Sequence, residues 1–201
     1  MLSRKAMLET GGYKDNHLGE DMEITLNVHR QGGDVQFLSE TLSWTEAPDN
    51  LRDVGKQRVR WFRGALQSFI EYRDLLFRKD NKVFSWIVLP YVWLADVFGA
   101  WIEVIGWIVA IYTIVTTSYD FTFFLMLWGF IMLCHYINLV MGIYFMHKKL
   151  EMTKGKGIIL FIALFEGITY HYLYVYWMIK AHIMELFSMK REWNKLDRKG
   201  F

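Results

Sequence analysis

Residues 121–146 contain no Asp, Glu, Lys or Arg at all. A helix needs about 20 predominantly apolar residues to cross a bilayer, and this stretch is longer than that. The apolar stretch before it, 84–115, is too long for one span, so we divide it into an interfacial helix at about 84–98 and a span at about 101–115. A third hydrophobic segment, 158–179, is long enough to cross or to lie in the interface. The sequence therefore predicts an integral, multi-pass membrane protein.

Basic residues predict the orientation of these segments, because Lys-rich loops stay on the cytoplasmic side. The connection at 147–157 carries four lysines and is expected in the cytoplasm. The two spans before this connection, 101–115 and 121–146, form a hairpin whose tip, 116–120, is then expected outside the cell. Residues 1–82 are then expected in the cytoplasm. The basic tail at 188–201 favours the cytoplasmic side as well. The chain starts without the apolar core of a signal peptide, so no cleavable signal is expected.

The charge balance and the cysteine content exclude several kinds of partner. The 201 residues include 23 Lys and Arg against 21 Asp and Glu, a net charge of +2. No strongly basic block is present, so we expect no nucleic-acid partner. The single cysteine, Cys134, excludes an internal disulfide and a cysteine-based zinc site. His135, His171 and His182 show no ligand spacing, so no metal site is predicted in this chain.

Residues 1–82 are expected to form a water-facing segment. Short helices are predicted at 5–9 and 19–30, each followed by a glycine pair that ends it. Imperfect apolar alternation at 34–44 predicts one or two short strands. A longer helix is predicted at 51–77.

The helix predicted at 19–30 begins with three acids, Glu20, Asp21 and Glu23. Their placement has an ordinary explanation, since acids interact favourably with the N-terminal dipole of a helix. The functional alternative is a general base, because a carboxylate aimed into a cleft can take a proton from a hydroxyl nucleophile. Both interpretations are open on spacing alone.

The helix predicted at 51–77 places Gln57, Arg60 and Trp61 on one face, at positions i, i+3 and i+4. An arginine can hold a diphosphate with two hydrogen bonds, and an indole offers a flat face to a sugar ring. A plain alternative is a solvated basic helix with Trp61 packed into the core.

Three acids fall within the apolar stretches: Asp96, Glu103 and Glu166. Ionisable groups at membrane depth are often functional, which raises a role in transport. The alternative is that these acids lie at the headgroup level or pair with arginine or lysine side chains.

The motifs together resemble a known family. GEDMEIT at 19–25, WTEAP at 44–48 and QRVRW at 57–61 occur in the order found in membrane-bound, processive family 2 glycosyltransferases. That group includes the synthases of poly-N-acetylglucosamine, hyaluronan, chitin and cellulose. The segments at 3–13 and 193–201 also resemble parts of bacterial members, so the resemblance covers nearly the whole chain.

The resemblance implies a role for each motif. Asp21 matches the general base of the family's acidic motif, with Glu20 as its neighbour. The QxxRW motif lies near the donor diphosphate and the terminal sugar of the acceptor. The implied substrate-binding residues are Gln57, Arg60, Trp61 and Glu46. The implied reaction is an inverting displacement at the anomeric carbon of a nucleotide sugar, with membrane helices guiding the growing glycan outward.

The chain also departs from the family pattern. It contains no DxD triplet and no glycine-rich strand–turn–helix at its start. No cofactor is therefore expected in this chain, while Mg²⁺ or Mn²⁺ is expected for the complete enzyme by resemblance. The expected fold is an α+β remnant of a GT-A (Rossmann-like) domain at 1–82, followed by membrane helices at 83–201, and it is predominantly helical overall.

Three functions follow as hypotheses. The first is the C-terminal portion of an inverting membrane glycosyltransferase of the cell envelope, inactive without a donor-binding N-terminal half. Its partners would be membrane lipid, a nucleotide sugar, a glycan acceptor and that separate half. The second is a non-catalytic accessory subunit of a glycan-assembly complex, and the third is a small transporter.

Overall fold

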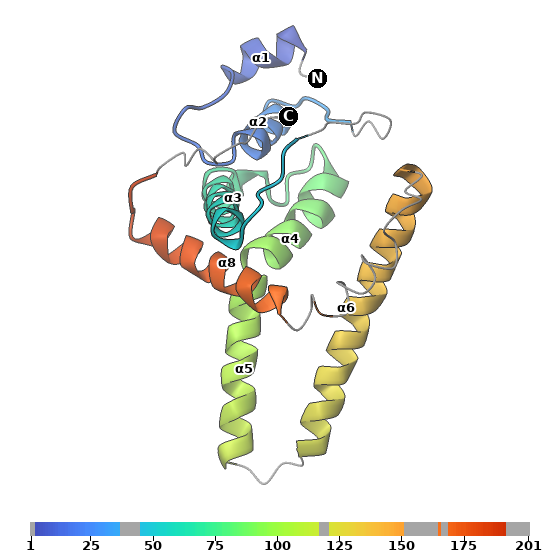
Figure 1. Ribbon diagram of the computed structural model, residues 1–201. Coiled ribbons are helices and arrows are strands. Elements are labelled where there is room, and N and C mark those ends of the chain that lie inside the picture. Colours follow the sequence, from blue (N-terminus) through green and yellow to red (C-terminus); the bar gives the residue numbers. More distant parts are fainter. Residues whose placement is uncertain (1–2, 37–44, 117–120, 151–164, 166–168, 192–201) are drawn as a thin grey trace. The chain divides into compact units, whose positions relative to one another are not determined.

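The computed structural model describes residues 3–36, 45–116, 121–150, 165 and 169–191. The regular elements in these ranges are helices (Figure 1). In chain order they are α1 (Arg4–Thr10), α2 (Glu20–Arg30), α3 (Leu51–Glu71), the 3-10 turn η1 (Arg73–Leu75), the π-helical segment η2 (Phe84–Val88), α4 (Leu89–Val92), the π-helical segment η3 (Trp93–Val97), α5 (Gly99–Thr116), α6 (Phe121–Leu150) and α8 (Tyr170–Leu186).

The predicted α+β remnant of a GT-A domain is wrong for the described residues, which contain helices and turns but no strand. The strands were expected at 34–44. Residues 34–36 are irregular, and 37–44 lie outside the described residues. A strand needs a neighbouring strand to satisfy its backbone N–H and C=O groups, whereas a helix satisfies them internally.

The chain divides into two compact units. One contains residues 1–100 and 177–201, and the other contains residues 101–176. The first unit carries all the residues singled out above for sugar chemistry. The functional division at residue 82, into a catalytic and a membrane part, stays a prediction.

The helices of the first unit begin and end where local side chains allow it. The Ser3 side chain accepts a hydrogen bond from the Ala6 N–H at 3.1 Å at the start of α1, and Gly11 ends α1 with φ of 75°. At the start of α3, the Asn50 side chain accepts a hydrogen bond from the Asp53 N–H at 2.9 Å. The helix expected at 51–77 ends earlier, at Glu71, because the chain turns through η1 to bury Leu75.

The apolar core of the first unit lies where α2, the end of α3 and the helical segment of η2, α4 and η3 meet. Its fully enclosed members are Leu26, Tyr72, Leu75, Leu89 and Trp93. Phe69 adds an edge-on ring contact to Trp93, with 4.1 Å between ring centroids. The core therefore fixes α2 against α3, and these two helices carry the acidic motif and the QxxRW motif.

The segment from Phe84 to Val97 is wound more widely than an α-helix, and Pro90 explains one part of this. Proline has no N–H to donate. The Leu89 N–H reaches back five residues to Phe84, and the Ser85 carbonyl instead accepts the Phe77 N–H at 3.1 Å. The wider turns also help to align residues four apart, so that Ser85, Leu89, Trp93 and Val97 are all buried.

The structure supports fewer membrane spans than the sequence predicted. Among the described residues one helix, α5, has both the length and the hydropathy of a membrane span, with 18 residues and a mean hydropathy of 1.7. The multi-pass expectation is therefore corrected to one candidate span. The helix α6 runs through 121–146. Of the third expected segment, 158–164 and 166–168 lie outside the described residues, as does Glu166.

Within the second unit, polar and aromatic contacts join the helices. His171 Nε2 lies 2.8 Å from Glu103 Oε2, and Trp107 meets Phe124 edge to face with centroids 5.8 Å apart. Glu103 therefore has a histidine partner, whereas pairing with arginine or lysine was one of the alternatives left open by the sequence.

Candidate active site

The three acids in the first turn of α2 differ in their exposure to solvent. Glu23 is completely buried, Glu20 is half-buried and Asp21 is exposed. The Asp21 carboxylate accepts a hydrogen bond from the Met22 N–H at 2.8 Å. Asp21 and Glu20 are therefore the acids of this turn that a substrate can reach.

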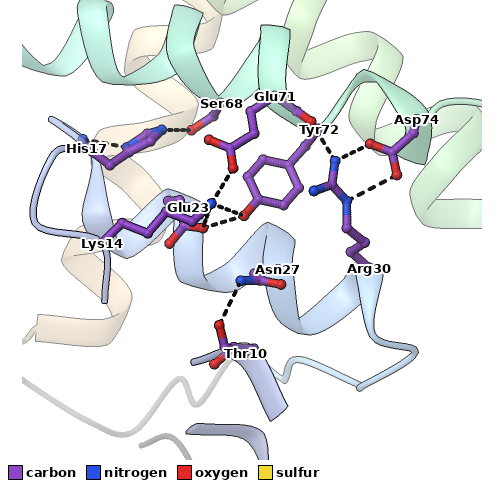
Figure 2. Close-up of polar contacts among 11 residues, drawn as sticks. Thr10, Lys14, His17, Glu23, Asn27, Arg30, Ser68, Glu71, Tyr72 and Asp74 are labelled. Atoms are coloured by element: carbon purple, nitrogen blue, oxygen red, sulfur yellow. Dashed lines mark hydrogen bonds and ion pairs between the residues drawn. The ribbon is translucent and has the colours of Figure 1, made fainter. Parts of the chain in front are cut away.

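Glu23 has a structural role, as Figure 2 shows. Its carboxylate pairs with Lys14 Nζ at 3.0 Å and accepts a hydrogen bond from the Tyr72 hydroxyl. Burial and the bond to Glu23 raise the pKa of Tyr72 to about 12, so the hydroxyl keeps its proton at neutral pH. Burial alone would lower the pKa of Lys14, but its bonds to Glu71, Glu23 and Tyr72 raise it overall. This network ties α2 and the preceding loop to the end of α3.

A second ion pair holds the other end of α2. The Arg30 guanidinium pairs with Asp74, with 3.1 Å between Nε and Oδ2, and it lies over the Tyr72 ring at 4.1 Å (Figure 2). The side chain of Asn27 donates to the Thr10 carbonyl at 3.2 Å, which secures α1. The orientation of α2 is thus fixed at both of its ends.

The loop before α2 packs directly on α3. A Cβ added to Gly64 would lie 2.5 Å from the Gly19 nitrogen, so the two backbones approach as closely as glycines allow. The Leu18 N–H donates to Gln67 Oε1 at 3.1 Å, and the Gly19 N–H donates to His17 Nδ1 at 3.1 Å. Burial lowers the pKa of His17, which favours the neutral ring that this last bond requires. Gly19, the first residue of the acidic motif, therefore packs on α3 within one helical turn of the end of the QxxRW motif.

The three predicted residues of the QxxRW motif lie along α3. Gln57 and Arg60 are half-buried, and Trp61 keeps 44% of its surface exposed. The guanidinium of Arg58 lies over the Trp61 ring at 4.5 Å. Phe62 rather than Trp61 is the buried aromatic of this turn, so the alternative of Trp61 as a core anchor is not supported.

Arg60 lines a pocket of about 400 Å³ between α3 and the second half of α8. The pocket wall is strongly cationic and contains no acid. Its positively charged residues are Arg52, Lys56, Arg60, Arg63, Lys180 and Lys190. Lys56 pairs with Asp53 at 2.6 Å and Arg63 pairs with Glu185 at 2.9 Å, and both carboxylates lie outside the lining.

The second half of α8 is held on α3 by buried contacts. Glu185 accepts hydrogen bonds from Arg63 and Gln67, at 2.9 and 3.0 Å. At the other end of the contact, a Cβ on Gly55 would lie 2.8 Å from the Trp177 indole nitrogen. The absence of a side chain at Gly55 lets the Trp177 ring lie against the helix backbone.

Asp21 lines a different, largely apolar groove that is formed with Leu26, Phe84, Leu89 and other residues of α2 and the helical segment after it. Within the part of the chain that the structure describes, the predicted base and Arg60 therefore line separate pockets. Glu46 lies half-buried in the irregular segment before α3. No group of three or more His, Cys, Asp or Glu in the described ranges could hold a metal ion.

Sequence reasoning missed the contribution of the second half of α8 and the residues that follow it. Lys180 and Lys190 line the cationic pocket, and Glu185 pairs with Arg63. The only signal in the sequence was a polar residue pattern at the end of an apolar helix, which says nothing about a partner more than a hundred residues away.

Comparison with known proteins gives the family of the sequence. The family model described as Glycosyl transferase family group 2 matches residues 1–180. The probable glycosyltransferase YdaM of Bacillus subtilis (strain 168) is 24% identical over 204 residues, which cover 97% of this chain and 47% of that protein. A poly-beta-1,6-N-acetyl-D-glucosamine synthase of Staphylococcus aureus (strain COL) is 22% identical over 102 residues, which cover 51% of this chain and 24% of that protein. The chain thus spans about half the length of the first of these relatives, and no solved structure matches it significantly.

Proposed function

The chain belongs to glycosyl transferase family group 2, and from that membership we propose that it forms the acceptor side of an inverting membrane glycosyltransferase. The enzyme would transfer a sugar from a nucleotide-sugar donor to a growing glycan of the cell envelope. The proposal extends to the processive, polysaccharide-forming members of the family, because one relative is named as a synthase of a glucosamine polymer.

The observation that carries the proposal is the contact of Gly19 with Gly64. Gly19 precedes Asp21 by two residues, and Gly64 follows Arg60 by four. Their backbone approach brings the acidic motif and the QxxRW motif into one neighbourhood on the same pair of helices. A catalytic constellation needs such support from rigid elements.

In the proposed reaction Asp21 acts as the general base. The acceptor hydroxyl attacks the anomeric carbon of the donor sugar and gives its proton to the Asp21 carboxylate. The bond from that carbon to the diphosphate breaks, and the diphosphate leaves with the bonding electrons, which inverts the configuration. Glu20 would assist Asp21 as a neighbouring acid.

The substrate-binding roles go to residues of α3 and the segment before it. The Arg60 guanidinium would bind phosphate oxygens, and the exposed ring of Trp61 would stack on the terminal sugar of the acceptor. Gln57 and Glu46 would hydrogen-bond sugar hydroxyls.

We propose that sugar transfer also requires a donor-binding part, which corresponds to the roughly half of the Bacillus subtilis relative that this chain does not match. A separate N-terminal half is one form that this partner could take. The described residues offer no cluster that fits a metal, so we assign Mg²⁺ or Mn²⁺ of the complete enzyme to that part and derive no step from it. The helix α5 would hold the chain in the cell membrane, in contact with lipid, with residues 1–82 in the cytoplasm.

One observation favours the alternative, a non-catalytic accessory subunit of a glycan-assembly complex. Asp21 and Arg60 line separate pockets within the described residues. A base and a diphosphate-binding residue of one reaction should face a common substrate. In the catalytic proposal the donor-binding part would bridge the two pockets.

Co-expression separates the two candidates. The chain is produced in membranes together with the N-terminal half of the Bacillus subtilis relative, and the release of nucleoside diphosphate from a panel of nucleotide sugars is measured. The catalytic proposal predicts turnover that needs both parts. Turnover by the donor-binding part alone, unchanged when this chain is added, would favour the accessory subunit.

A further inference from the structure

The cationic pocket between α3 and α8 draws half of its lining from residues with positive charge. The two segments that supply them, around 52–63 and 177–190, are far apart in the chain. Of the six cationic residues, Arg52, Lys56, Arg60 and Arg63 come from α3, whereas Lys180 and Lys190 come from the C-terminal segment. The fold, rather than local sequence, gathers these charges.

Gathering like charges is unfavourable unless an anion offsets the repulsion. Positive charges that share one small pocket repel each other, and the repulsion is screened less there than in bulk water. The carboxylates of Asp53 and Glu185 relieve Lys56 and Arg63, but neither lines the pocket. A pocket whose own wall has no acid keeps a positive potential and attracts a multiply charged anion.

The contacts that bring the C-terminal segment to the pocket are specific. The Arg63 guanidinium donates to Glu185 Oε2 and to the carbonyls of Met189 and Lys190, at 2.9, 2.7 and 3.2 Å. These bonds fix the backbone at Lys190. At the opposite end, the close packing of Trp177 on Gly55 fixes the helical turn that carries Lys180.

We propose that Lys180 and Lys190 complete a binding site for a diphosphate or phosphate group, together with Arg52 and Arg60. The site deepens the proposed function and rests on it, because a nucleotide sugar carries a diphosphate. Two residues of the C-terminal segment thereby become substrate-binding residues. A phosphate-bearing lipid headgroup is the other source of the same chemistry.

The chemistry of the wall favours phosphate over other anions. Arginine binds phosphate oxygens in pairs, and lysine adds a mobile point charge. A pocket of about 400 Å³ lies within the range of roughly 300–1,000 Å³ that is usual for ligand sites. It is therefore large enough for a diphosphate and part of the group attached to it.

Titration calorimetry on the detergent-solubilised chain tests the site with two probes. Inorganic pyrophosphate stands for the diphosphate, and dihexanoyl-phosphatidylglycerol stands for the lipid headgroup. The variant K180Q/K190Q removes two charges from the pocket. The matched control K79Q/K82Q removes two charges from exposed lysines outside it. A third variant, K180R/K190R, keeps the charge and tests whether folding is affected.

The site predicts that K180Q/K190Q weakens the binding of pyrophosphate by about tenfold or more, while the control stays within about twofold and K180R/K190R retains binding. If only the binding of phosphatidylglycerol depends on the two lysines, the site holds and its source is the lipid headgroup. Absence of binding by the native chain, or equal binding by K180Q/K190Q and K79Q/K82Q, would overturn the site.

The binding readout is independent of sugar transfer. D21N should bind pyrophosphate as the native chain does, even though the proposed function predicts that its rate of sugar transfer falls by about 10²–10⁴. Normal pyrophosphate binding without transfer in any reconstitution would count against the proposed function alone.

Discussion

Arg63 of α3 and Glu185 of α8 form an ion pair, with 2.9 Å between Nε and Oε2, and their side chains retain only 4% and 7% of their exposure. The two residues are 122 positions apart in the chain. Arg191 Nε adds a further bond to the Glu185 carboxylate at 3.1 Å. Burial alone would raise the pKa of Glu185, but the bonds from Arg191, Gln67 and Arg63 lower it overall. The pair fixes the C-terminal part of α8 beside the helix that carries the QxxRW motif.

Glu185→Gln is expected to destabilise the first unit strongly. Removing one partner of a buried pair leaves an uncompensated charge, here Arg63, at a cost of about 3–5 kcal/mol. Thermal unfolding in detergent, followed by circular dichroism, measures the loss. Glu9→Gln is the control, because Glu9 and Lys5 form an exposed pair worth at most about 1 kcal/mol. Equal unfolding temperatures for the two variants would show that the Arg63–Glu185 pair does not hold α8.

Gly64→Ala is expected to separate the acidic motif from α3. Its Cβ would lie 2.5 Å from the Gly19 nitrogen, and backbone atoms cannot move aside without shifting the loop. We expect a loss of about 1–3 kcal/mol in the free energy of unfolding, as for other overpacked sites. Gly106→Ala is the control, since nothing lies within 4 Å of a Cβ there. A Gly64→Ala variant as stable as Gly106→Ala would contradict the close approach.

Acid is expected to destabilise the fold through His17. Burial lowers the pKa of His17 below its ordinary value of 6.5, so below that pH the unfolded chain binds more protons than the folded one. The contribution of neutral His17 to the free energy of unfolding is therefore complete above pH 6.5. It declines as the pH falls towards the pKa of His17 in the folded chain.

The unfolding temperature between pH 7 and pH 5 measures this effect. His17→Gln keeps an acceptor for the Gly19 N–H and should reduce the pH dependence. The substitution should not abolish the pH dependence, because burial also lowers the pKa of His29 and His182. An unchanged pH dependence in His17→Gln would mean that His17 titrates as it does in water.

Trp61→Ala is expected to impair acceptor binding more than stability. The ring is 44% exposed, so its loss should change the free energy of unfolding by no more than about 1 kcal/mol. In the co-expressed enzyme the KM for the acceptor glycan should rise severalfold, because the stacking surface is lost. The comparable exposed tryptophan, Trp86, gives the control Trp86→Ala. Equal KM values for the two variants would remove Trp61 from the acceptor site.

Local patterns in the sequence predicted much of the first unit correctly. The glycine pairs after α1 and α2 located the ends of these two helices, because a glycine cap depends on neighbouring residues. The charged first turn of α2 was visible as well. The sequence did not reveal that Glu23 is buried while Asp21 is accessible, since the burial of Glu23 depends on Tyr72 and Lys14 from other parts of the chain.

Long-range features escaped the sequence for a physical reason. Apolar alternation predicted strands at 34–44, of which residues 34–36 are irregular and 37–44 lie outside the described residues. The cationic pocket depends on the approach of Lys180 and Lys190 to α3. That approach is fixed by the Arg63–Glu185 pair and the packing of Trp177 on Gly55, contacts that no short sequence window contains.

The rate of sugar transfer by Asp21→Asn tests the central claim most directly. The assay uses the chain co-expressed with a donor-binding half, and Asp15→Asn, at another exposed aspartate, is the matched control. With Asp21 as the general base, the rate should fall by about 10²–10⁴ in Asp21→Asn, with unchanged unfolding temperature, and should stay near the native rate in Asp15→Asn. Equal rates in the two variants would show that Asp21 is not the base and that this acidic motif does not serve catalysis.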